Sequence, residues 1–273
     1  MSTFRLAISL VVIFVACAPP PQPAPAALDA NVEWFWVHAD SETDSVIADS
    51  AATLAVAGKA STRTTKDPLK ARSRVTLTAD ELAPVMLTTN DPSTAKGLLA
   101  VDVFPCTLDK LQSILSDPDQ ATLYPNTWDK YSRTLNGDRA AYLSGSAATL
   151  SWDAEVDITF PVADSYTSTM KGSLRRVHPP SGQVPSDIIL ARTWLAAPAH
   201  FLTASSSSYV KQDYEIEIFW EQTPGTIFHS YGMWRDVKVG GFNYTLADDN
   251  FFTIVVNNLV DWDNKTAALC AKP

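Results

Sequence analysis

The sequence predicts an α+β protein in which an antiparallel β-sheet is covered by a long C-terminal helix. Residues 152–160 and 213–221 alternate apolar side chains with acidic or polar ones, which is typical of β-strands whose two faces differ. Residues 250–270 carry apolar side chains at spacings of three and four, as an amphipathic helix does. Such a helix is stable when its apolar side is buried, so we expect it to cover the apolar face of the sheet.

The first residues resemble the signal peptide of a bacterial lipoprotein. Arg5 precedes an uncharged run, residues 6–16, which is roughly half of the ~20 apolar residues that a membrane-spanning helix needs. The run ends in Phe14-Val15-Ala16-Cys17, which resembles a lipobox with Phe14 where leucine is usual. The resemblance implies that residues 1–16 are removed and that Cys17 receives a lipid.

Two alternatives remain open for this first segment. Ala24-Pro25-Ala26 offers a site for an ordinary signal peptidase, which would release an unanchored protein. Cys17 could instead be a structural cysteine. That alternative is the weaker one, because the residues that follow Cys17 are too rich in proline and alanine to build a core.

Residues 17–30 are interpreted as a tether rich in proline and alanine. This composition favours extended polyproline II at about 3 Å per residue, which would hold the following domain away from a membrane surface. Ala18, directly after the lipidated cysteine, resembles the sorting signal for the outer membrane. We therefore expect an exported protein, anchored by its lipid in the bacterial cell envelope at the outer membrane.

Charge and cysteine content narrow the possible partners and the compartment. The formal net charge is −9, which argues against nucleic acid as a partner. Cys106 and Cys270 are the two cysteines that remain once Cys17 is lipidated. In an oxidising compartment two such cysteines suggest a disulfide, and two separately buried thiols are the alternative.

Residues 31–95 are interpreted as a partly helical N-terminal extension. Ser41 and Asp44 have the spacing of a capping box ahead of an apolar helix, and Thr78 and Glu81 repeat that spacing. The segment between these two helices is polar and basic, so we expect it on the surface.

The main domain is expected to occupy residues 96–273. It begins with an apolar strand, residues 97–104, followed by a helix for which Thr107 is the expected cap. Asn136-Gly137-Asp138 and Thr223-Pro224-Gly225 predict the turns of hairpins. Four further segments have the composition of strands: residues 166–177, 188–195, 226–237 and 242–246.

The order of these elements resembles the helix-grip fold that START domains, Bet v 1-like proteins and polyketide cyclases share. The resemblance covers residues 96–273 and implies that a curved antiparallel sheet wraps around the final helix. It also implies that Cys106, at the entry to the first helix, lies near Cys270, at the end of the last, so that a disulfide would join them. Besides the closing helix at 250–270, the most similar stretch is Val101-Asp102-Val103-Phe104-Pro105-Cys106-Thr107-Leu108-Asp109-Lys110-Leu111.

The resemblance further implies a cavity between sheet and helix that takes lipids, sterols or other apolar ligands. Arg192, His229 and Arg235 lie in expected strands beside apolar neighbours and are candidates for its polar groups. The alternative is that the aromatic side chains simply fill the interior. The residues expected to line the cavity are Trp152, Val156, Ile158, Trp194, Tyr214, Ile216, Ile218, Trp220, Tyr231, Met233, Phe252, Val255 and Leu259.

Few residues point to catalysis or to a metal, and we expect neither a metal nor a cofactor. The sequence lacks a Gly-x-Ser-x-Gly motif, and its four histidines lack the spacing of zinc ligands. His229 would be the general base of a cyclase- or hydrolase-like enzyme if it pointed inward. The alternation of His38, Asp40, Glu42 and Asp44 would form a cation site only on an extended backbone, whereas Ser41 predicts a helix start there.

The leading hypothesis is a membrane-anchored lipoprotein that binds or carries an apolar small molecule or lipid in an internal pocket. One alternative is a structural or protein-binding envelope lipoprotein without a ligand, whose partner the sequence does not identify. A cyclase- or hydrolase-like enzyme is the least favoured of the three.

Overall fold

The computed structural model describes residues 24–60, 69–73, 76–87, 89–159, 165–201, 208–238 and 249–272. The expected signal peptide, Cys17 and the first part of the tether lie outside these residues, as does the strand expected at 242–246. Lipidation of Cys17 therefore stays a prediction. Within the described ranges, no helix combines the length and the apolarity needed to cross a bilayer.

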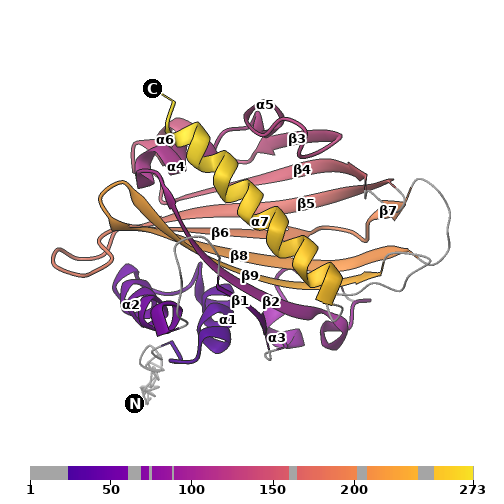
Figure 1. Cartoon of the computed structure of the whole chain (residues 1–273), viewed down its shortest axis with the longest axis horizontal. Helices are drawn as coiled ribbons and strands as arrows, with labels where there is room; N and C mark the ends of the chain where they lie inside the picture. Colours follow the sequence, from indigo (N-terminus) through magenta and orange to yellow (C-terminus); the bar gives the residue numbers. More distant parts are fainter. Residues whose placement is uncertain are drawn as a thin grey trace, which may run out of the picture.

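The described strands form one antiparallel sheet (Figure 1). Their order across the sheet is β1-β2-β9-β8-β6-β5-β4-β3, and β7 pairs with β5. The first long strand, β2, pairs with the last strand, β9, so segments from the two ends of the main domain lie side by side. The strands are β1 (Leu69–Ser73), β2 (Lys96–Pro105), β3 (Lys130–Leu135), β4 (Thr149–Thr159), β5 (Ser165–Val177), β6 (Ile188–Leu195), β7 (His200–Phe201), β8 (Tyr209–Thr223) and β9 (Thr226–Lys238).

The closing helix α7 (Asp249–Cys270) runs diagonally across one face of this sheet (Figure 1). An open, curved antiparallel sheet that grips a C-terminal helix is the helix-grip fold, so the fold class predicted from the sequence is confirmed. The remaining helices are α1 (Leu28–His38), α2 (Asp44–Ala60), α3 (Ala79–Leu82), the 3₁₀ turn η1 (Pro92–Thr94), α4 (Leu108–Leu115), α5 (Gln120–Leu123) and α6 (Arg139–Leu143).

Local sequence signals account for several element boundaries. Thr78 and Glu81 form a capping box at the start of α3, and the Thr107 side chain accepts a hydrogen bond at the start of α4. The β8–β9 hairpin turns at Gly225, whose φ of 77° costs a glycine little. The basic segment that ends at Ser73 contains strand β1, which the sequence analysis did not predict. A short polar strand at a sheet edge lacks the apolar alternation that marks a strand with a buried face.

Apolar side chains pack against both faces of the sheet. On the face opposite α7, the N-terminal helices contribute the fully buried Val32, Trp36 and Ile47 to a core shared with β6, β8 and β9. On the other face, Val255 and Leu259 of α7 pack against side chains of β2, β8 and β9. The N-terminal extension therefore supplies a second cover for the sheet.

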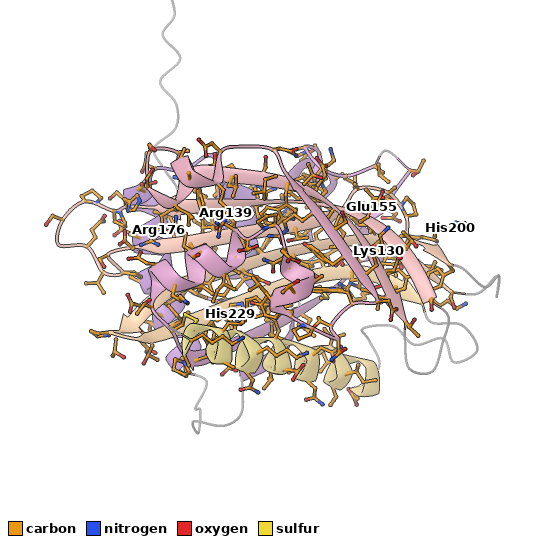
Figure 2. The ribbon with its side chains drawn as sticks, turned by 90° about the horizontal axis from the view of Figure 1, so that it is seen from above. Lys130, Arg139, Glu155, Arg176, His200 and His229 are labelled. Carbon is orange, nitrogen blue, oxygen red and sulfur yellow. A yellow bond between two sulfur atoms is a disulfide. The ribbon has the colours of Figure 1, made fainter. Side chains whose placement is uncertain are left out.

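This second cover does not extend to β4. The outward-facing Glu155 is exposed and lies 3.6 Å from Lys130 of β3 (Figure 2), and the half-exposed Asp153 lies 3.5 Å from Lys171 of β5. Strand β4 therefore has one dry and one wet face, whereas β6, β8 and β9 are covered on both sides. This difference decides which side chains reach the interior under α7.

The approach of α1 to the sheet depends on Gly232 in β9. A Cβ atom at this position would lie 2.4 Å from Cγ1 of Val32 and 3.2 Å from Cγ2 of Ile216. We expect Gly232→Ala to lower the free energy of unfolding by about 1–3 kcal/mol through overpacking, measured by urea denaturation. In the Val32→Ala background the same change should cost much less. Equal costs in both backgrounds would mean that α1 does not pack here.

The expected disulfide is present: Cys106 and Cys270 are bonded, with their Cα atoms 5.3 Å apart. Cys106 follows β2 directly and precedes α4, while Cys270 is the last residue of α7. The bridge therefore fixes the C-terminal end of α7 to the start of α4, next to the sheet.

Candidate functional site

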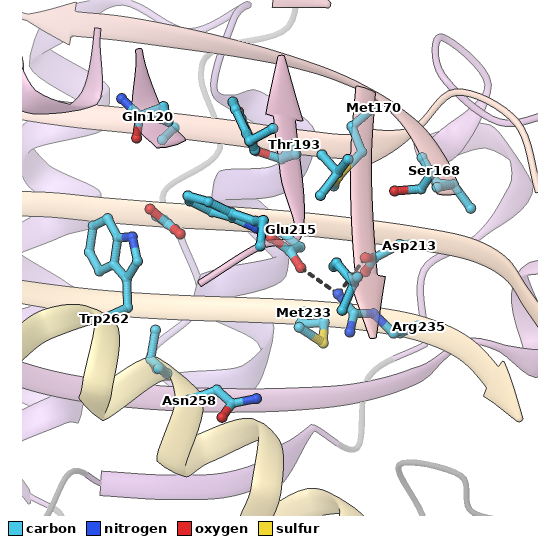
Figure 3. Close-up of a pocket in the computed structure, with 18 of the residues that line it drawn as sticks. Gln120, Ser168, Met170, Thr193, Asp213, Glu215, Met233, Arg235, Asn258 and Trp262 are labelled. Atoms are coloured by element: carbon cyan, nitrogen blue, oxygen red, sulfur yellow. Dashed lines mark hydrogen bonds and ion pairs between the residues drawn. The ribbon is translucent and has the colours of Figure 1, made fainter. Parts of the chain in front are cut away.

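A cavity of about 340 Å³ lies between the sheet and α7. Side chains from β3, β4, β5, β6, β8 and β9 form one wall, and residues between Ile254 and Trp262 of α7 form the other (Figure 3). Ligand pockets in proteins span about 300–1,000 Å³, so this volume suits a small molecule. The aromatic side chains of this region therefore leave the interior hollow rather than filling it.

Only some of the residues expected to line the cavity point into it. Strand β4 points its apolar row inward, as expected, and so do β9 and α7. Phe252 packs beside the α7 residues of that core but does not line the cavity. The expected apolar residues that do line it are Trp152, Val156, Ile158, Tyr231, Met233, Val255 and Leu259.

The expected cavity residues of β6 and β8 lie on the opposite face of the sheet. Their side chains pack in the core formed with α1 and α2, so this part of the prediction was wrong. It assumed that the sheet has a single covered face. Because the side-chain period of a strand is two, an apolar row directed toward α1 turns the alternate row toward α7. The residues concerned are Trp194, Tyr214, Ile216, Ile218 and Trp220.

Arg192, an expected polar group of the cavity, also faces the N-terminal helices. Its guanidinium forms an ion pair with Asp40 and lies 4.5 Å from the centre of the Trp36 ring. Burial lowers the pKa of Arg192, and the Asp40 carboxylate counteracts that shift. His38 lies 3.5 Å from Glu42 across one helical turn, so the extended alternation needed for a cation site is not formed. Within the described ranges no group of side chains is arranged as metal ligands.

The inward row of β8 is acidic, which the sequence analysis missed. Asp213, Glu215 and Glu217 line the cavity on alternate positions of this strand. Arg235 of β9, which was expected in the cavity and does line it, forms ion pairs with two of them, at 2.8 Å from Glu215 (Figure 3). The sequence shows that apolar and acidic residues alternate along β8, but it does not show which of the two rows faces α7.

Enclosure changes the acidity of these carboxyl groups. Burial raises the pKa of Glu215 to about 8, with a further contribution from the nearby Asp213. Burial raises the pKa of Glu217 to about 7. Burial alone would lower the pKa of Arg235, but its two carboxylate partners raise it well above its ordinary value. At neutral pH the cavity therefore holds a firmly charged arginine beside glutamates that bind protons readily.

We expect the free energy of unfolding to fall as the pH rises from about 4.5 to about 7. Below that window Glu217 is protonated in both states, whereas above it the folded protein must bury a charge that the unfolded chain exposes to water. The pKa rise of Glu217 corresponds to at most about 3 kcal/mol. Glu215 extends the same slope toward pH 8. Chemical denaturation across this pH range measures the effect.

Two glutamine variants separate this effect from general surface charge. Glu217→Gln should remove part of the slope and stabilise the protein above pH 7, because no charge then has to be buried. Glu155→Gln, on the exposed face of β4, should leave the slope unchanged. A Glu217→Gln profile parallel to that of the wild type would contradict the prediction.

His229, the candidate general base, lies outside the cavity wall. Its side chain is fully buried between the sheet and α7, and its Nδ1 lies 2.9 Å from Oδ1 of Asp263 (Figure 2). The ring stacks on Phe219, with 4.3 Å between ring centres. Burial alone would lower the pKa of His229, but the Asp263 carboxylate raises it overall. This geometry makes the residue a link between β9 and α7.

Solved structures of similar architecture share little sequence with this chain. No family model and no curated protein matches it. The human StarD13 lipid transfer and protein localization domain is 9% identical, covers 75% of this chain and 86% of its own, and has a TM-score of 0.45. For a STAR-related lipid transfer protein from Xanthomonas axonopodis these values are 9%, 76%, 96% and 0.43. For the ZhuI aromatase/cyclase from a Streptomyces species they are 12%, 64%, 92% and 0.37. Such likeness concerns the fold alone.

Proposed function

We propose that this protein binds or carries an apolar small molecule or lipid in the cavity between the sheet and α7. The observation that carries the proposal is the cavity itself, which remains open although large apolar side chains surround it. A cavity of this volume, with many apolar and aromatic side chains in its wall and a few polar groups, suits a ligand with an apolar part. Two of the similar structures are named lipid transfer proteins, which agrees with this use of the fold.

The cavity also has a route to the surface. Ile254 of α7 lines the cavity, and yet 51% of its surface is exposed. The cavity therefore reaches solvent beside Ile254, an apolar side chain in the first half of α7.

The proposal includes a place for the domain. The lipobox-like segment would attach the protein through Cys17 to the bacterial cell envelope, at the outer membrane, where apolar molecules are plentiful. In the native organism, Cys17→Ala should move the protein from the membrane fraction to the soluble fraction. If Cys17→Ala leaves the protein in the membrane fraction, the proposed lipid anchor is wrong, whereas the proposed binding function is not affected.

Native mass spectrometry of protein purified without detergent tests the binding function. We expect a bound small molecule, and we expect an apolar fluorescent probe to bind once that molecule is extracted. Thr193→Trp should abolish both, because the larger side chain fills the cavity that Thr193 lines. Thr169→Trp, on the exposed side of β5, is the matched control and should bind normally. A wild-type protein that binds neither would overturn the proposal.

A further inference from the structure

Of the three carboxylates on the cavity wall, Glu217 is the one that has no hydrogen-bond or ion-pair partner within the described ranges. The other two, Asp213 and Glu215, share the guanidinium of Arg235. A carboxylate enclosed by protein is costly unless a cation or a hydrogen-bond donor accompanies it. Nothing in this part of the chain supplies such a group to Glu217.

The nearest cations are already engaged by other residues. Arg133 donates to the carbonyl oxygen of Leu115 at 2.7 Å and to the hydroxyl of Tyr131 at 3.0 Å. Nδ1 of His229 lies 2.9 Å from Oδ1 of Asp263, and its Nε2 has no hydrogen-bond partner within the described ranges, Glu217 included. No side chain of the described residues pairs with this carboxylate, so we expect its partner to be a proton or part of a ligand.

The rest of the wall suits a cation better than an anion. Both guanidinium groups of the wall, Arg133 and Arg235, already have partners, so the charged group left to bind a ligand is the Glu217 carboxylate. Aromatic faces add to this preference, because their electron-rich surfaces attract cations. A ligand carboxylate or phosphate would meet the acidic row of β8 instead. The aromatic side chains of the wall are Trp128, Tyr131, Trp152, Tyr166, Tyr231 and Trp262.

We infer that the ligand carries a protonated amine, which pairs with Glu217 while its apolar part occupies the remainder of the cavity. This inference rests on the proposed binding function and names the polar group of its ligand. The apolar part then lies against Met233, Val255 and Leu259, which line the same cavity.

Three probes with one chain length test the choice of polar group: dodecylamine, dodecanol and dodecanoate, titrated by calorimetry below their micelle concentrations. Wild-type protein should bind dodecylamine most tightly and dodecanoate most weakly. A hydrogen bond between charged groups in such a site corresponds to about tenfold to hundredfold in affinity. Glu217→Gln should therefore lose about that factor for dodecylamine and much less for dodecanol, whereas Glu155→Gln should change neither.

The possible results separate this inference from the proposed function. If dodecanol binds as tightly as dodecylamine, or if Glu217→Gln weakens both equally, the inference of a protonated amine is overturned. The cavity would then remain a site for apolar ligands. If none of the three probes binds and no molecule co-purifies, the proposed function itself fails.

The pH dependence of dodecylamine binding supplies a second measurement. Burial raises the pKa of Glu217 to about 7, so at low pH the amine must displace a proton. The affinity should rise about tenfold between pH 6 and pH 8, and this rise should be absent in Glu217→Gln. A pH-independent affinity in the wild type would contradict the pairing. The ionisable groups that face Glu217 are Glu215 on its own strand, Arg133 of β3, Tyr231 and His229 of β9, Asp263 of α7, and Tyr124, which directly follows α5.

Discussion

Replacing both Cys106 and Cys270 by alanine is expected to lower the free energy of unfolding by about 3–5 kcal/mol. The bridge spans 164 residues of sequence, and it therefore restrains most of the main domain in the unfolded chain. In the chain-entropy account, a loop of this length is among those whose closure stabilises a protein most. Urea denaturation of oxidised wild type and of the double variant measures the difference.

Reduction of the wild-type protein is the control for the disulfide experiment. Reduced wild type and the Cys106→Ala/Cys270→Ala variant should unfold at similar urea concentrations, because both lack the same cross-link. The variant should also bind an apolar probe more weakly, since its α7 is no longer fixed at the C-terminal end. If reduced wild type and the double variant were both as stable as the oxidised protein, packing alone would hold the C-terminal end of α7 to the start of α4.

The closing helix, strand β4 and the disulfide could be predicted because their signals are local or chemical. The spacing of apolar residues along α7 leaves little choice for that segment, and β4 alternates between apolar and acidic side chains. The pairing of Cys106 with Cys270 followed from the cysteine count and the resemblance together. Each of these features depends on one contact only: α7 and β4 each bury one apolar face, and each cysteine needs one other cysteine.

The inward face of β8 could not be predicted, for a physical reason. Ile216 and Ile218 would be buried equally well under α7 or under α1, and the sequence of the strand is compatible with both. The packing of the N-terminal helices on the sheet decides which face of β8 points toward α7. This packing is a long-range contact, for example between Val32 of α1 and Gly232 of β9. Nothing in the sequence of residues 31–95 indicates which face of the sheet these helices cover, so the acidic row of the cavity could not be predicted.

The same contact links the N-terminal extension to the binding site. Because α1 and α2 bury the apolar row of β8, Glu215 and Glu217 are left to face α7. A cover on one side of a sheet thus sets the chemistry on the other. The extension therefore has a functional consequence without touching the ligand, and its loss would be expected to alter ligand affinity as well as stability.

Replacing His229 by leucine is expected to lower the free energy of unfolding by about 3–5 kcal/mol at neutral pH. The change leaves the Asp263 carboxylate buried without its cation. Burial raises the pKa of Asp263, and the nearby Asp102 carboxyl raises it further. Chemical denaturation of the variant and of wild type measures the loss.

The pH dependence distinguishes a lost ion pair from a lost packing contact. In the variant, protonation of Asp263 removes the buried charge, so the part of the penalty that comes from the lone carboxylate should be small near pH 4 and should grow as the pH rises. In wild type the raised pKa of His229 gives stability that is present below about pH 6.5 and lost as the pH rises through the folded-state pKa. A penalty independent of pH would indicate packing alone.

The double variant His229→Leu/Asp263→Leu tests whether the unpaired Asp263 carboxylate causes the loss of stability. A buried ion pair replaced by apolar side chains of similar volume is often neutral for stability, whereas a buried charge left alone is not. The double variant should therefore regain most of the stability that His229→Leu loses, and its stability should vary less with pH than that of either parent. A double variant less stable than His229→Leu would contradict this account. Recovery would show that the stability lost in His229→Leu comes from the unpaired Asp263 carboxylate.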